Sequence, residues 1–204
     1  MTLLEQLGTA LGLASLAGVN LYLTVLIAGL AVRFNWVEWA GAHESLAVLG
    51  DPWVISIAAV FFVIEFFADK VPWLDSIWDA VHTVIRPAGG IYLGLAALGE
   101  LNPAVTVIAV MATGGAALST HGTKASVRAA LNTSPEPVSN SVASVTEDGL
   151  VLGGLGLIAI APALAFFVFL LIIIACTAFT IWLWRMLFGR KNKRPATATG
   201  IEIT

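Results

Sequence analysis

Long runs without a charged residue are the feature that most constrains the fold of this chain. The segment 6–32 contains no charge in 27 residues, and the segment 149–184 contains none in 36. Roughly 20 apolar residues in a helix cross the hydrocarbon core of a bilayer, so each run is long enough to span it. Only 11% of the residues are charged, against roughly 25% in soluble domains, and we therefore predict an integral membrane protein.

Prolines divide the remaining apolar sequence into further segments. We expect the first run to form one retained helix that spans the membrane with some tilt, and Pro52 to open the next. Pro72, Pro103 and Pro162 interrupt the later apolar stretches. The sequence thus predicts an all-α, polytopic helical bundle of about six membrane segments, some of them broken by proline or re-entrant. We expect a single transmembrane domain over residues 1–189, with halves of about 1–102 and 103–189 if the chain is internally duplicated.

The basic residues are concentrated after the last apolar run, at Arg185, Arg190, Lys191, Lys193 and Arg194. By the positive-inside rule this end is cytoplasmic, and residues 190–204 form a basic, polar cytoplasmic tail. An even number of spans would make the N-terminus cytoplasmic as well.

Two segments, 65–87 and 121–148, place ionisable side chains where the pattern is otherwise apolar. Charge at membrane depth is costly and usually has a function. Glu65 and Asp69 are four residues apart and share one helix face, and Lys124 and Arg128 share another. We expect the following residues to line a substrate or ion pathway: Asn20, Glu65, Asp69, Lys70, Asp75, Asp79, His82, Arg86, His121, Lys124, Arg128, Asn140 and Glu147.

The two charged segments can be aligned with each other. PWLDSIWDAVH from Pro72 and PVSNSVASVTE from Pro137 share the pattern P-x-x-[DN]-S-[IV]-x-[DS], and each is followed by a glycine-rich stretch and a Pro-Ala pair. The pattern fits an inverted repeat, in which broken helices at corresponding positions form a central binding site. Two unrelated amphipathic loops would explain it equally well.

These residues suggest a proton or cation site at Glu65 and Asp69, and a site for an anionic solute or lipid head group at Lys124 and Arg128. Structural ion pairs between helices are the alternative. The leading functional hypothesis is a small secondary transporter or translocase, driven by protons, with the lipid bilayer and a second copy of the chain as partners. A membrane scaffold is the second hypothesis. A lipid-modifying enzyme is the third, although Ser119 lies on a different helix face from His121. No catalytic residue, cofactor, metal or nucleic-acid partner is predicted.

The strings EFFADKVPWLDSIWD, HTVIRPAGG, HGTKASVRAALNTSPEP and SNSVASVTED resemble the signature of a bacterial family of multi-pass membrane proteins, known as a domain of unknown function. The resemblance covers nearly the whole chain, with one departure at Val138, where an aromatic residue is expected. It implies a location in the bacterial cytoplasmic (inner) membrane and a shared polar core. It does not imply a particular substrate.

Overall fold

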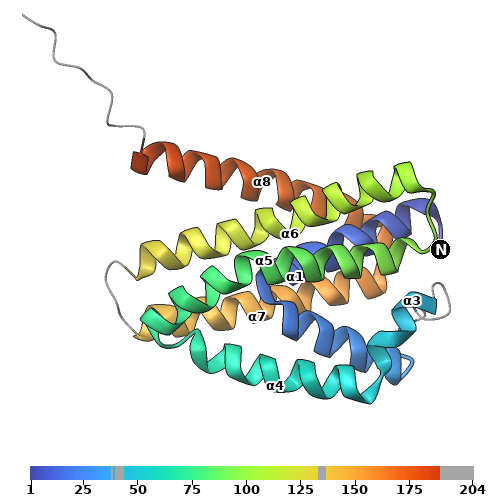
Figure 1. Ribbon diagram of the computed structural model, residues 1–204, viewed down its shortest axis with the longest axis horizontal. Coiled ribbons are helices and arrows are strands. Elements are labelled where there is room, and N and C mark those ends of the chain that lie inside the picture. The colour runs from blue at the N-terminus through green and yellow to red at the C-terminus, as the bar shows by residue number, and fades with distance from the viewer. Residues whose placement is uncertain (38, 40–43, 133–136, 189–204) are drawn as a thin grey trace, which may run out of the picture.

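The computed structural model describes residues 1–37, 39, 44–132 and 137–188, and the predicted tail at 190–204 lies outside them. Helices account for nearly all of the described chain, without a strand among these residues, so the predicted all-α class is confirmed. Figure 1 shows the bundle that they form. The elements are α1 (Leu3–Arg33), α3 (Glu44–Ala47), the 3₁₀ helix η1 (Val48–Gly50), α4 (Pro52–Ala68), α5 (Pro72–Leu98), α6 (Pro103–Leu131), α7 (Pro137–Ile160) and α8 (Pro162–Phe188).

Proline begins each helix from α4 to α8. The first residue of a helix has no partner for its N–H, so proline loses nothing there and has a suitable φ angle. Asp51 and Asn102 cap two of these starts, accepting hydrogen bonds from Trp53 N at 2.7 Å and Val105 N at 3.0 Å. The predicted breaks at Pro72, Pro103 and Pro162 are confirmed.

The first helix is not the single tilted span that we expected. Asn20 has φ −147° and ψ 100°, far from helical values, and α1 changes direction there. A straight helix of 31 residues would be about 46 Å long, well beyond the roughly 30 Å of a bilayer core. The half before Asn20 runs antiparallel to α7, because Gly8 packs against Pro162 and Gly12 packs against Ile158.

The half of α1 after Asn20 returns along α4. Tyr22 stacks on Phe61 of α4 with ring centroids 4.9 Å apart, and Arg33 lies beside Gly50 at the start of that helix. Both ends of α1 therefore lie at the same end of the bundle, and Asn20 is the apex of a re-entrant hairpin (Figure 1). This hairpin is the centre of the molecule, since α1 contacts each helix from α4 to α8.

Five helices, α1 and α5 to α8, are long and apolar enough to cross a membrane. The pair formed by α3–η1 and α4, which bend by 60° at their junction, makes a sixth candidate segment if it is counted as one, against the expected number of about six. Because α1 folds back, only α4 to α8 pass from one end of the bundle to the other. Leu3 and the last turn of α8 consequently lie at opposite ends, and the prediction that both termini share one side is wrong (Figure 1).

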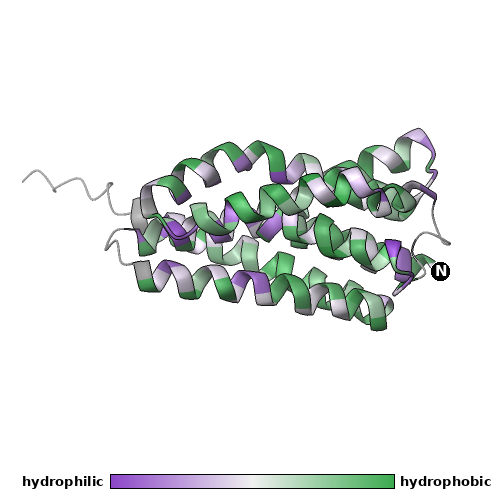
Figure 2. Cartoon of the chain, turned by 90° about the horizontal axis from the view of Figure 1, so that it is seen from below, coloured by the Kyte–Doolittle hydropathy of each residue, from purple (hydrophilic) through white to green (hydrophobic). Residues whose placement is uncertain are grey.

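The two aligned segments begin at the same end of the bundle. Arg128 shows this directly, because its Nη1 lies 3.6 Å from Asp75 Oδ1 in α5 and 3.3 Å from the backbone oxygen of Asn140 in α7. Helix α6 returns the chain between them, so α5 and α7 run in parallel. The order of elements repeats as the alignment suggested, but the expected inversion is wrong. Figure 2 shows hydrophilic segments between mainly hydrophobic helices.

Candidate functional site

Ionisable side chains from four neighbouring regions meet inside the bundle. Residues spaced three or four apart on α5 and α6 project from one face of each helix, and the end of α4 and the middle of α7 complete the ring. Eight of these side chains form what we call the charged cluster: Glu65, Asp69, Asp75, Asp79, Arg86, Lys124, Arg128 and Glu147. All eight were among the residues predicted from the sequence.

Arg86 occupies the deepest part of the charged cluster and is fully buried. Its Nη2 lies 2.6 Å from Glu65 Oε1, and its Nη1 lies 3.3 Å from Asp79 Oδ1. The same Nη1 lies 2.9 Å from Nδ1 of His121. Arginine nitrogens only donate, so Nδ1 of His121 accepts this bond and carries no proton. Arg86 thereby joins α4, α5 and α6.

Lys124 and Arg128 follow toward the end of the bundle where α5 and α7 begin. Nζ of Lys124 lies 3.2 Å from Glu147, 3.5 Å from Glu65 and 3.6 Å from Asp69. Nη2 of Arg128 lies 2.7 Å from Glu147 and 3.2 Å from Asp69. The residues that we expected to hold an anion are thus already paired with carboxylates of the same chain.

Carboxylates outnumber cations in the charged cluster: five acidic side chains share three basic ones. Four of the acidic residues each have one buried oxygen without a hydrogen-bond partner in the described part of the chain: Glu65 Oε2, Asp69 Oδ1, Asp75 Oδ1 and Asp79 Oδ2. An uncompensated buried carboxylate is costly, and a proton or another cation removes that cost. The charged cluster therefore carries more formal negative charge than positive charge.

Asp69 lies in the short connection between α4 and α5, outside the membrane-spanning helices, and is only 2% exposed. Burial raises the pKa of its carboxyl, and the nearby carboxylates of Glu65 and Glu147 act in the same direction. Lys124 and Arg128 oppose this effect without cancelling it. Asp69 and Asp75 both lie toward the end of the bundle where α5 begins, and Asp75 accepts a hydrogen bond from Asn132 at the C-terminal end of α6.

The apex of α1 adjoins the charged cluster. The side-chain oxygen of Asn20 accepts from Leu23 N at 3.0 Å, which caps the second half of the helix, and its nitrogen donates to Asp148 at 3.0 Å. The backbone oxygen of Val19 accepts from Nζ of Lys124 at 3.3 Å. The predicted involvement of Asn20 therefore has a geometric basis, although its first role is to cap the returning helix.

The remaining predicted residues lie at the margins. His82 is buried, but it bonds to Trp78 O and to the hydroxyl of Tyr22, not to a charged group. Asn140 donates to Asn132 and accepts from Arg128 through its backbone. Lys70 is not part of the cluster: its Nζ donates to Phe66 O at 2.8 Å and lies over the Phe66 ring. Lys70 directly follows Asp69 in the tight connection between α4 and α5, and this step of one residue turns its side chain to another face.

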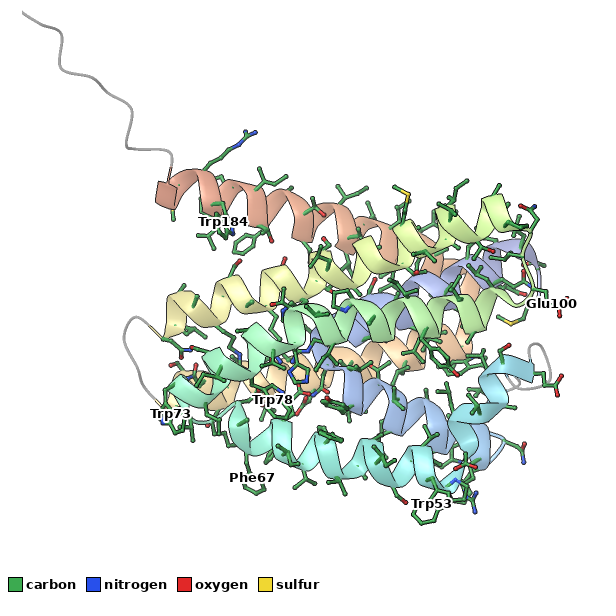
Figure 3. The ribbon with its side chains drawn as sticks, in the orientation of Figure 1. Trp53, Phe67, Trp73, Trp78, Glu100 and Trp184 are labelled. Atoms are coloured by element: carbon green, nitrogen blue, oxygen red, sulfur yellow. The ribbon has the colours of Figure 1, made fainter. Side chains whose placement is uncertain are left out.

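Two residues near the cluster were not predicted: Ser144 and Asp148. Ser144 Oγ lies 3.5 Å from Asp69, and the alignment of the two segments had already matched Ser144 with Asp79. The alignment could therefore have identified Ser144 from the sequence. Figure 3 shows Trp53, Phe67 and Trp73 pointing away from the bundle, whereas Trp78 lies among the interior polar side chains. The proposed enzyme pair is absent among the described residues, since Ser119 bonds to Thr177 of α8 and His121 faces α5.

The family model described as a domain of unknown function, DUF4126, matches residues 7–185. The chain belongs to this family. The matched range of this DUF4126 protein includes both halves of α1 and the whole charged cluster, so the site lies within the family domain. The resemblance noted in the sequence is confirmed. No curated protein and no solved structure matches the chain.

Proposed function

We propose that this DUF4126 protein is a small secondary transporter in which the charged cluster binds and releases protons. The observation that carries the proposal is the surplus of carboxylates over cations inside the bundle. Intramembrane acidic residues of this kind form the proton relays of pumps and transporters. Asp69 is the proposed site of proton exchange, with Glu65 and Asp79 deeper in the same network.

Protons suit the cluster better than a bound metal ion does. Among the described residues, no three side chains of His, Cys, Asp or Glu converge as metal ligands. The oxygens without a hydrogen-bond partner belong to separate residues along the cluster, an arrangement that favours protons moving between single carboxylates. An anionic solute would have to displace carboxylates from Lys124 and Arg128, so a neutral or cationic solute suits the cluster better.

The re-entrant hairpin supports a transport role. Transporter sites are commonly formed where half-helices end inside the membrane and where irregular backbone borders a cavity. Here the hairpin enters from one end of the bundle, and the charged cluster extends from the opposite end to the hairpin apex at Asn20. The apex of the hairpin and the inner part of the charged cluster meet at that point.

The same geometry suggests an orientation of the protein in the inner membrane. The basic residues that follow the last span favour a cytoplasmic location for the end of α8 by the positive-inside rule. The connection at Asp69 is then cytoplasmic, and both ends of α1 are on the external side. Protons would enter and leave the cluster from the cytoplasm at Asp69.

A pH jump applied to proteoliposomes on a solid-supported membrane tests this function without a known substrate. The wild type is expected to give a transient charge displacement when the cluster gains or loses protons. Asp69→Asn should abolish the signal, whereas Glu100→Gln, which alters an exposed carboxylate at the other end of the bundle, should retain it. A wild-type signal equal to that of protein-free liposomes would refute the proposal, as would an undiminished signal in Asp69→Asn.

A further inference from the structure

A cavity of about 550 Å³ lies beside the charged cluster, between α6, α7, α8 and the first half of α1. This volume falls within the roughly 300–1,000 Å³ that is usual for small-molecule sites. Its wall is mainly apolar and includes Leu16, Leu150, Leu157, Val168, Phe169 and Ile172. An apolar wall of this kind is suited to a hydrocarbon or aromatic group.

Glycines on α7 keep this cavity open. Gly149 and Gly153 are one turn apart and both line it, and a Cβ atom added to either would find no atom within 4 Å. Gly154 instead packs closely against Leu16 and Phe169.

Two charged side chains, Lys124 and Glu147, form one part of the cavity wall, and they pair at 3.2 Å. Lys124 is only 2% exposed, and its ammonium group already faces three carboxylates and the oxygen of Val19. Glu147 is 14% exposed, and its Oε1 accepts one hydrogen bond, from Arg128 Nε at 3.0 Å. A carboxylate oxygen can accept two, so Glu147 offers a ligand a negatively charged acceptor in a wall whose other polar groups are mainly hydroxyls.

We propose that this cavity binds an amphiphilic cation, meaning a singly charged ammonium or phosphonium group attached to an apolar body. The positive charge lies near Glu147 Oε1, and the apolar body packs against α7 and α8. The surplus of carboxylates behind Glu147 favours a cation over an anion of the same shape. This inference rests on the proposed transport function and names its substrate class, with the cation supplying the positive charge that protons otherwise provide.

Equilibrium binding of tetraphenylphosphonium to the full chain in lipid nanodiscs tests the inference, with tetraphenylborate as a probe of similar shape and opposite charge. We expect saturable binding of the phosphonium and none of the borate. Gly153→Phe fills the cavity and should weaken binding by at least ~10-fold, about 1.4 kcal/mol. Gly156→Phe is the matched control, because Gly156 also has open space around it but does not line the cavity. Gly149→Leu replaces Gly153→Phe if the latter fails to fold.

Equal or tighter binding of the borate would overturn the inference, as would failure of the phosphonium to bind. Unchanged phosphonium binding in a folded cavity-filling variant would overturn it too. The pH-jump signal of the wild type separates this inference from the transport proposal, since it is recorded without any phosphonium. If the wild type gives no pH-jump signal, the transport proposal fails whatever the binding result.

Discussion

Nζ of Lys124 lies 3.3 Å from the backbone oxygen of Val19, the residue just before α1 reverses direction. The last carbonyls of a helix lack partners within it and carry partial negative charge. A lysine of the charged cluster satisfies one of them here. The re-entrant hairpin and the cluster are thus one unit, and a change in either is expected to affect the other.

The hairpin apex should depend on both hydrogen-bonding groups of Asn20. Asn20→Ala removes the cap on Leu23 N and the bond to Asp148, and loss of a cap alone costs about 1 kcal/mol. Asn20→Ser keeps an acceptor for the cap and loses the donor to Asp148, so its melting temperature in detergent should lie between those of wild type and Asn20→Ala. Equal melting temperatures for all three proteins would show that the apex does not depend on this residue.

The fold-back of α1 makes a prediction about sidedness. In a Cys176→Ala background, single cysteines at Leu3, Phe34 and Trp73 occupy exposed positions. A membrane-impermeant maleimide should label Leu3→Cys and Phe34→Cys from the same side of oriented vesicles, and Trp73→Cys from the other. A straight first helix would instead place the Leu3 and Phe34 positions on opposite sides.

Glu65→Gln should destabilise the protein strongly. Arg86 is fully buried, and without the Glu65 charge it retains Asp79, at 3.3 Å, as its remaining ion-pair partner. Removing one partner of a buried ion pair typically costs about 3–5 kcal/mol, and the hydrogen-bonding ability of glutamine should keep the loss near the lower value. Denaturant or thermal unfolding in detergent measures the change. Glu100→Gln should shift stability by less than ~0.5 kcal/mol, as expected for an exposed position.

Asp69 should make stability depend on pH. Because burial raises the pKa of this carboxyl, the folded chain keeps a proton at pH values where the unfolded chain, with an ordinary Asp pKa of about 3.9, has lost it. Its favourable contribution is therefore complete below about pH 3.9 and is lost as pH rises through the folded value. Asp69→Asn should lose this dependence, so its stability relative to wild type should rise with pH across that window. A constant difference between the two proteins would contradict the raised pKa.

Much of the helix layout follows from local chemistry in the sequence. Pro52, Pro72, Pro103 and Pro162 mark helix starts because the first position tolerates a missing N–H. The fold-back at Asn20 was not predicted, because the uncharged run 6–32 suits one tilted span as well as a hairpin. The distinguishing feature is a side-chain cap, for which a single asparagine gives little signal.

The composition of the site was easier to predict than its geometry. Charges three or four residues apart on a helix had to meet polar partners inside an apolar bundle, so Arg86, Lys124 and Arg128 were identifiable. The alignment of the two segments could not give their relative direction, which depends on how many helices lie between them. The sequence does not show which carboxylates share a cation. Only the three-dimensional structure gives this pairing, and with it the surplus of carboxylates in the cluster.

Infrared difference spectroscopy of the protein in lipid tests the central claim, that surplus carboxylates of the charged cluster hold protons. A titration between acidic and alkaline pH should reveal the carbonyl band of a protonated carboxylic acid that persists above the ordinary Asp and Glu range, roughly pH 4. This band should shift in heavy water and disappear in Asp69→Asn, while Glu100→Gln leaves it unchanged. If every carboxyl group ionises in the ordinary range, or if the persistent band survives in Asp69→Asn, Asp69 is not the proton-binding group.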